Sequence, residues 1–318
     1  MTEFAIGVDL GGTNLKLGAI HETGELLEQV LLPSNTKAGR DDVVERLCKA
    51  IMELARRWEK QHQLAGIGVG IAGIMRLKEG VVIAAPNLPG WEGFPIRNQI
   101  QKELKAPFVL ENDANAAALG EKWLGAAQEI ENFAFLTLGT GIGGGLILNG
   151  KIWHGMSGMA GELGHVNIRP EGRLCNCGSH GCLESYSSGT AVVKSVKELV
   201  ESGRASQKLR SLVESNKVLK ADAIFRLAMR GDDSSILVFR EMGRALGIAI
   251  AGFIHSLDIE SVVLGGGATA SWDAFQETMF EEVHRNSFIQ RVDPRQIVRS
   301  RLGSQAGIFG AAYLGFQL

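Results

Sequence analysis

Three of the four cysteines in this chain lie within one eight-residue stretch, at Cys175, Cys177 and Cys182, and His165 stands ten residues before it. Three thiolates and one imidazole supply the four soft or borderline ligands that tetrahedral Zn2+ prefers. Clustered cysteines in a chain without a recognisable secretory leader favour a metal over a disulfide. The spacing therefore predicts a structural zinc site. The alternative is a cysteine-rich loop with free thiols.

Two carboxylates, Glu162 and Glu184, flank this predicted metal site in the sequence. Glycines at positions 178 and 181 permit the tight turning that a loop around an ion requires. A metal there would stiffen the loop and hold the acidic groups in place. His180 lies inside the cluster and is a competing ligand.

Residues 9–14 (DLGGTN) form the first of three glycine-rich segments. Glycines let backbone amides approach an anion closely, while the Thr and Asn side chains add donors. The acidic residue could hold a Mg2+-bound water, and a lysine adds positive charge. A tight hairpin is the alternative reading. The candidate nucleotide-binding residues here are Asp9, Gly11, Gly12, Thr13, Asn14 and Lys16.

The second and third glycine segments are residues 139–145 (GTGIGGG) and 265–267 (GGG). The second repeats the chemistry of the first, so two glycine hairpins would clamp a polyphosphate chain. The third ends a predicted strand, where a nucleoside could pack on bare backbone. Together the segments predict a nucleoside triphosphate bound with Mg2+. The candidate contacts are Gly139, Thr140, Gly141, Gly265, Gly266 and Gly267.

Asp113 joins a predicted strand at 107–111 to an Ala-rich predicted helix at 114–126. Aspartate is a favoured helix N-cap, and capping alone would explain its position. A carboxylate there is also held rigidly and kept ionised by the helix dipole, which suits a base beside a substrate hydroxyl. Phosphoryl transfer asks mainly for orientation and late acceptance of one proton. Asp113 is therefore the candidate general base.

Carboxylates and amides that accept from vicinal hydroxyls are what a polyol site needs. Glu162 and His165 stand three residues apart, on one face if the segment is helical, although surface pairing would also explain them. Glu184, Asn112 and Asn87 add further candidates. A site of this kind rejects analogues that lack a hydroxyl, because its buried polar groups would be left unpaired.

The composition bounds the function class. With 318 residues the chain can form one large or two ordinary domains. Its 33 basic and 35 acidic residues exclude a nucleic-acid binder that relies on a general basic field. The apolar runs are too short for a membrane span. No signal peptide is visible, so a cytoplasmic protein is expected. Cys48 reads as a small buried hydrophobe.

Hydrophobic periodicity predicts an α/β chain with two related halves. The strand, glycine turn and strand at the start recur after residue 132, which indicates two domains that share a cleft. The predicted strands are 4–10, 15–21, 25–32, 66–72, 107–111, 133–138, 145–149 and 260–264. The predicted helices are 41–62, 94–105, 114–126, 189–202, 220–230, 234–256, 272–285 and 305–315.

Together these motifs resemble the ROK family (repressors, open reading frames and kinases), and within it the bacterial glucokinase branch. The resemblance covers nearly the whole chain. It rests on residues 9–14 (DLGGTN), 111–115 (ENDAN), 139–145 (GTGIGGG), 161–165 (GELGH) and 175–184 (CNCGSHGCLE). It implies an actin-like (ribonuclease H-like) two-domain fold with ATP and sugar in the interdomain cleft.

The pattern along the chain places the domain boundary within the predicted helix 114–126. The resemblance implies that the final helix, 305–315, packs back on the N-terminal domain, and it implies residue roles. The N-terminal domain would comprise 1–118 plus 303–318, and the C-terminal domain 119–302 would carry the zinc site. Asp113 would be the general base. The zinc, held by His165, Cys175, Cys177 and Cys182, would brace the wall of the sugar site rather than activate water. The implied sugar ligands are Asn87, Asn112, Asp113, Glu162, His165 and Glu184.

The implied reaction is ATP-dependent phosphorylation of a hexose at the 6-hydroxyl, with glucose as the expected substrate. Residues 86–91 (PNLPGW) look like the glucokinase branch. The alternatives are mannose, fructose, allose, N-acetylglucosamine or N-acetylmannosamine as substrate, polyphosphate as donor, and a noncatalytic sugar sensor. ROK repressors carry a helix-turn-helix before the first glycine loop, which here begins at residue 11. The expected assembly is a homodimer, with a tetramer as the alternative.

Overall fold

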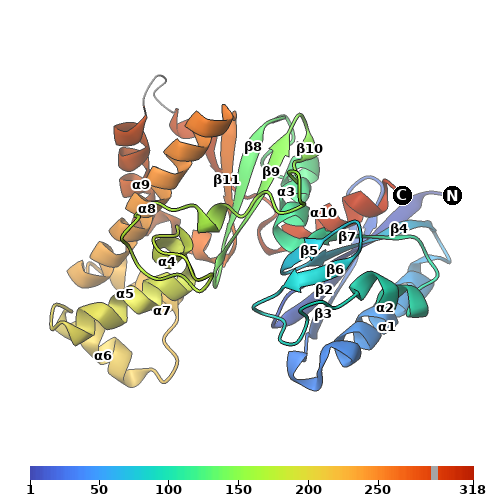
Figure 1. The fold of residues 1–318 in the computed structure, drawn as a ribbon, viewed down its shortest axis with the longest axis horizontal. Helices are drawn as coiled ribbons and strands as arrows, with labels where there is room; N and C mark the ends of the chain where they lie inside the picture. The colour runs from blue at the N-terminus through green and yellow to red at the C-terminus, as the bar shows by residue number, and fades with distance from the viewer. Residues whose placement is uncertain (288–292) are drawn as a thin grey trace. The chain divides into compact units, whose positions relative to one another are not determined.

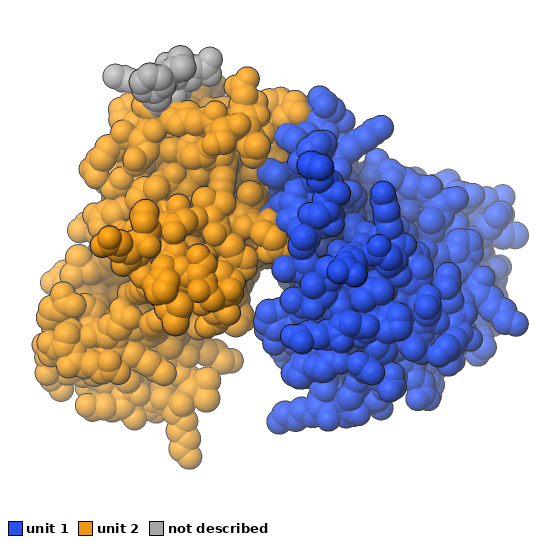
Figure 2. Space-filling model, viewed as in Figure 1, with its two compact units in different colours: residues 1–131, 145–161, 301–318 blue, residues 132–144, 162–300 orange. Residues whose placement is uncertain are grey.

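The computed structural model describes residues 1–287 and 293–318 (Figure 1). The chain forms two compact units, which are coloured separately in Figure 2. Unit 1 comprises Met1–Glu131, Gly145–Gly161 and Arg301–Leu318, and unit 2 comprises Asn132–Gly144 and Glu162–Ser300. The domain bounds expected from the sequence, 1–118 plus 303–318 against 119–302, stay a prediction.

A five-stranded sheet with the order β3-β2-β1-β4-β7 forms the centre of unit 1. The first three strands, which match the predicted strands 4–10, 15–21 and 25–32, form an antiparallel meander, and β4 and β7 extend it in parallel. Most residues of β1 and β4 are buried, as expected for strands covered on both faces. The strands are β1 Glu3–Leu10, β2 Asn14–His21, β3 Leu26–Pro33, β4 Gln63–Ile71 and β7 Phe108–Asn112.

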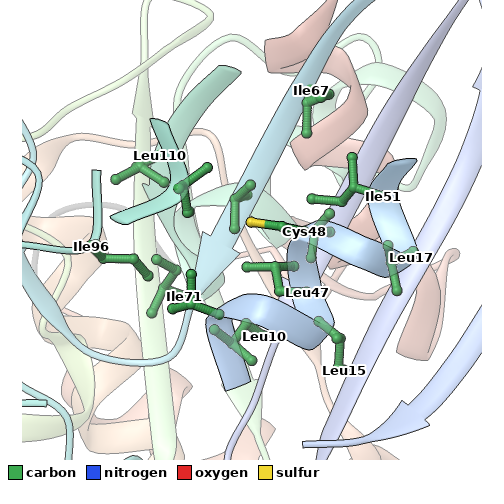
Figure 3. Close-up of a cluster of buried hydrophobic side chains, with 14 of the residues drawn as sticks. Leu10, Leu15, Leu17, Leu47, Cys48, Ile51, Ile67, Ile71, Ile96 and Leu110 are labelled. Carbon is green, nitrogen blue, oxygen red and sulfur yellow. The ribbon is translucent and has the colours of Figure 1, made fainter. Parts of the chain in front are cut away.

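Helix α1 (Arg40–Trp58) covers one face of this sheet. Its apolar stripe packs into the core shown in Figure 3, where Leu47, Cys48 and Ile51 meet Leu10 and Leu17 of the strands. Cys48 is 1% exposed, and burial raises the pKa of its thiol to about 12. The expectation of a small buried hydrophobe is confirmed.

Helix α10 (Ala306–Gly315) packs on the sheet in a second hydrophobic cluster, which Ala5 of β1 shares with Ile308. Side chains alternate between the faces of a strand, so Ala5 faces α10 while Phe4 and Ile6 face the other core. A Cβ atom on Gly7 would overlap the backbone of Ile308, so the helix can lie on the strand only because this position is glycine. Unit 1 also contains α2 Ile96–Glu103, α3 Asp113–Leu124 and the hairpin β5 Ile74–Arg76 with β6 Val81–Ala84.

The second sheet has the order β10-β9-β8-β11-β12. Its parallel strands β8, β11 and β12 carry the buried core of the second half. The strands are β8 Phe133–Leu138, β9 Ile142–Leu148, β10 Lys151–Ile152, β11 Ser261–Gly265 and β12 Ile297–Arg299. The helices are α4 Glu184–Ser187, α5 Gly189–Glu201, α6 Gln207–Ser215, α7 Ala221–Ala228, α8 Asp233–Leu257 and α9 Trp272–Asn286.

The predicted long elements are confirmed, with differences at their ends. The strand expected at 145–149 begins at Ile142 instead, so only the first part of the segment 139–145 is loop. The sequence did not predict the hairpin β5–β6, helix α6 or strand β12, because short elements give weak periodicity. Within the described ranges, every helix is too short or too polar to span a bilayer.

Candidate active site and metal centre

The junction between β7 and α3 positions the candidate base. Asn112 occupies the N-cap position of α3, and its Oδ1 accepts hydrogen bonds from the backbone N–H groups of Ala114 (2.9 Å) and Asn115 (3.1 Å). Asp113 is the first residue of the helix and is partly buried. Because Asn112 holds the cap position, capping does not account for an aspartate at position 113.

The side-chain nitrogen of Asn112 makes a further contact at this junction. Its Nδ2 donates to the carbonyl oxygen of Gly73 at 3.1 Å, which fixes the orientation of the side chain. An amide carries two N–H groups, so one bond to Gly73 leaves donor capacity for a ligand. The sugar-binding role expected for Asn112 is compatible with this geometry and stays a prediction.

Glu111, the last residue but one of β7, stabilises the same junction through hydrogen bonds of its carboxylate. It is 4% exposed, and its Oε1 accepts from Asn112 N (2.9 Å) and Asn115 Nδ2 (3.0 Å). Its Oε2 is paired with Nε2 of His154 at 2.7 Å, and this hydrogen bond raises the pKa of His154. Sequence reasoning missed both partners, because a lone histidine carries no spacing signal and Glu111 reads as the end of a strand.

The first glycine loop is a closed hairpin turn between β1 and β2. Gly11 N donates to Asn14 O at 3.0 Å, and the hydroxyl of Ser34 donates to Gly11 O at 2.5 Å. A Cβ atom on Gly12 would overlap the carbonyl oxygen of Asn87. The structure therefore brings the predicted sugar ligand Asn87 against the predicted phosphate loop.

Asp9 and Lys16 face each other beside this loop. They are register partners in the β1–β2 ladder, and their charged groups lie 3.7 Å apart. Burial raises the pKa of the Asp9 carboxyl, against the lowering effect of Lys16. Lys16 also donates to the carbonyl oxygen of Ser304 at 2.9 Å, just before α10 begins. This carboxylate–ammonium pair could serve a magnesium ion and a phosphate group.

The second glycine loop lies against the N-terminus of α5. Gly139 N donates to Gly141 O at 2.9 Å, which closes the turn. Gly189 N donates to Gly139 O at 2.8 Å, and the hydroxyl of Thr190 donates to the carbonyl oxygen of Thr140 at 2.7 Å. The thirteen-residue helix α5 thus holds the loop in place.

The third glycine segment lies next to the second. Gly266 has a φ of +83°, which favours glycine, and a Cβ atom there would lie 2.5 Å from the carbonyl oxygen of Leu138. Leu138 ends β8 immediately before the second loop. Because β8 and β11 are parallel neighbours, both segments follow the carboxyl ends of their strands. The structure brings residues 139–141 and 265–267 together, as a nucleotide site requires.

The predicted zinc ligands converge. One ligand atom from each of His165, Cys175, Cys177 and Cys182 lies within 4.8 Å of the others. Cys177 Sγ and Cys182 Sγ are 3.7 Å apart, as are Cys175 Sγ and His165 Nδ1. A tetrahedral ion with Zn–S bonds of about 2.3 Å separates its sulfur ligands by about 3.8 Å. The donor set and its spacing therefore fit zinc, and the competing His180 is not a member of the group.

His165 presents its two ring nitrogens to different neighbours. Nδ1 faces Cys175, while Nε2 lies 3.9 Å from Glu162 Oε2. Burial raises the pKa of the Glu162 carboxyl, His165 lowers it, and the negative charge of Glu184 raises it further. The two carboxylates predicted to flank the metal site, Glu162 and Glu184, therefore lie close enough in unit 2 for their charges to interact.

Glu184 contacts the second glycine loop as well as the metal cluster. Its Oε2 accepts from Ile142 N at 2.8 Å, and its Oε1 lies 3.8 Å from Cys175 Sγ. Sequence reasoning did not anticipate the contact with Ile142, which lies 42 residues away along the chain. No local pattern encodes such a contact.

Comparison with known proteins adds independent findings. A family model described as "ROK family" matches residues 5–317. The chain is 34% identical to a glucokinase of Halalkalibacterium halodurans, over 97% of this chain and 94% of that protein. It is 36% identical to a glucokinase of Thermotoga maritima, over 96% and 95% respectively. A solved ROK family glucokinase from Streptomyces griseus, in complex with glucose and AMPPNP, superposes with a TM-score of 0.83 at 32% identity, covering 99% of this chain and 100% of that one.

Proposed function

The chain belongs to the ROK family, and we propose that within it the chain is an ATP-dependent hexose kinase that acts on the 6-hydroxyl of glucose. Its fold is the actin-like fold of that family's kinases, as the sequence predicted. The position of Asp113 carries the proposal. The residue opens α3 on a junction that Asn112 caps and Glu111 supports, so the backbone that carries the carboxylate is held in place.

In the proposed reaction the sugar 6-oxygen forms a bond to the γ-phosphorus while the bond from phosphorus to the ADP oxygen breaks. Asp113 accepts the hydroxyl proton late, as the new bond forms. The dipole of α3 favours the ionised carboxylate needed for this role. The proposed sugar ligands are Asn87 and Asn112 in unit 1 and Glu162, His165 and Glu184 in unit 2.

The glycine loops are the proposed nucleotide site. The first loop, with Thr13, Asn14 and Lys16, would contact phosphate oxygens. Gly139, Thr140 and Gly141 would present backbone amides to the same chain of phosphates, and residues 265–267 would pack against the nucleoside. Asp9 would hold Mg2+ through water, and the ion when bound neutralises charge on the phosphate oxygens.

The proposed role of zinc is structural. With His165 and three thiolates as ligands, a tetrahedral ion has no open position for water. The ion would keep His165 Nε2 and the Glu184 carboxylate at fixed places for the sugar. A homodimeric, cytoplasmic protein stays the expectation from the sequence.

The test is ATP-dependent phosphorylation across glucose, mannose, fructose, allose, N-acetylglucosamine and N-acetylmannosamine, with kcat/KM as the readout. The proposal expects glucose to have the highest value. A higher value for another sugar would keep the reaction and replace the substrate. Polyphosphate in place of ATP tests the donor. If no sugar is phosphorylated with either donor, the kinase proposal is wrong.

A further inference from the structure

The Ile142 peptide at the end of the second glycine loop is held from two sides. On one side its N–H group donates to Glu184 Oε2 at 2.8 Å. On the other side Gly164 lies so close that a Cβ atom there would overlap the Ile142 carbonyl oxygen. Gly164 directly precedes His165, so both segments that carry proposed sugar ligands in unit 2 touch the same peptide.

The Glu184 carboxylate also lies close against Gly141 of the loop. A Cβ atom on Gly141 would overlap Glu184 Oε2, so this glycine is the only residue type that lets the carboxylate approach the loop. The opposite end of the loop is fixed separately, because Gly139 O accepts from Gly189 N at 2.8 Å. At the other end, beyond the backbone bond between Gly139 and Gly141, the charged side chain that holds the Ile142 N–H group is Glu184.

We propose that Glu184 is a positioning residue for the loop at 139–142, and that it couples sugar binding to nucleotide binding within unit 2. The inference rests on the proposed function, because it takes Glu184 as a sugar ligand. A glutamate side chain has several rotamers, and a sugar that engages its carboxylate selects one of them. The rotamer seen here also holds Ile142 N–H, so the sugar orders the loop that faces the phosphates.

Coupling of this kind is reciprocal. If the sugar tightens nucleotide binding by some factor, the nucleotide must tighten sugar binding by the same factor. The factor is a ratio of affinities, so it stays measurable even when a substitution weakens one of the two ligands. This separates a coupling role of Glu184 from its contribution to sugar affinity alone.

The experiment measures the Kd of a non-hydrolysable ATP analogue with Mg2+, by calorimetry, in the absence and presence of saturating glucose. For the zinc-loaded wild-type protein we expect glucose to tighten the analogue by about tenfold, within the usual range of coupling between sites. Glu184→Asp keeps the charge and shortens the side chain that reaches Ile142. The ratio of the Kd for the analogue without glucose to the Kd with glucose should therefore fall close to unity.

The matched control is Glu162→Asp, the same truncation at the other carboxylate, which lies beside His165. It should weaken glucose binding and preserve the ratio. Gly141→Ala provides a second variant, which keeps the Glu184 side chain but displaces its carboxylate from the loop. This variant should abolish the coupling. Zinc content and the melting temperature of each variant establish that it is folded.

Three results would overturn the inference alone. The first is a wild-type ratio of unity in a protein that binds both ligands. The second is a ratio that survives in Glu184→Asp and Gly141→Ala. The third is a ratio that is lost equally in Glu162→Asp. A wild-type protein that binds no hexose at all would instead overturn the proposed function, and this inference with it.

Discussion

His154 Nε2 and Glu111 Oε2 lie 2.7 Å apart, so a histidine from the segment after β10 is tied to the strand that leads into Asp113. Glu111 is almost fully buried, whereas the His154 side chain is 38% exposed. The same Glu111 carboxylate accepts from Asn112 N and from the Asn115 side chain. The pair therefore supports the junction that carries the proposed base.

This pair predicts a pH-dependent contribution to stability. The hydrogen bond to Glu111 raises the pKa of His154, so the folded protein binds the proton more tightly than the unfolded chain does. The stabilisation is fully present below the unfolded value of about 6.5 and is lost as the pH rises through the higher folded value. His154→Gln should thus lower the free energy of unfolding by on the order of 1 kcal/mol near pH 6, after allowance for solvent screening, and by less near pH 9.

Urea denaturation at the two pH values provides the measurement. His62→Gln is the matched control, because His62 is hydrogen-bonded to the neutral hydroxyl of Thr2 rather than to a carboxylate. An equal loss of stability at both pH values in His154→Gln would show that the pair is not ionic.

Removal of one cluster thiol should release the proposed zinc. Cys177→Ser takes away one of four ligands, and we expect less than one zinc per chain by elemental analysis, a lower melting temperature and weaker glucose binding. Cys48→Ala, which removes the thiol on the buried face of α1, should keep the metal. Normal glucose affinity in metal-free protein would contradict the bracing role of the ion.

The contact between α3 and α10 should tolerate no side chain at Gly310. A Cβ atom there would overlap the carbonyl oxygen of Ala116, which is rigid backbone. Gly310→Ala should therefore destabilise the protein by about 1–3 kcal/mol or more through overpacking. Gly252→Ala in α8, where no described atom outside the adjacent helix backbone lies within 4 Å of the new Cβ, should stabilise it by about 0.5–1 kcal/mol. Similar melting temperatures for both variants would refute this account of the packing.

How much the sequence could predict depended on the distance over which each feature is encoded. Three cysteines and His165 lie within eighteen residues, so their spacing predicted a cluster, and the family resemblance favoured His165 over His180 as its fourth member. The junction at Asp113 was predictable as a strand followed by a helix. That Asn112 holds the cap position depends on side-chain geometry, which a run of Asp and Asn residues leaves open.

The contacts that the sequence could not predict join distant segments. Glu111 and His154 are 43 residues apart, and Glu184 and Ile142 are 42 apart. Each pair is brought together by the tertiary fold, so neither periodicity nor motif spacing carries the information. The hairpin β5–β6 was missed for a different reason, because strands of three and four residues show too little alternation.

Replacement of the proposed base tests the central claim most directly. Asp113→Asn keeps the size of the side chain and removes its capacity to accept a proton. We expect kcat for glucose phosphorylation to fall by about 10²–10⁴-fold, while the Kd for glucose changes little. Asp41→Asn makes the same change in the first turn of α1, at an exposed aspartate, and should retain full turnover. If Asp113→Asn also retained wild-type kcat, Asp113 would not be the base and the proposed mechanism would be wrong.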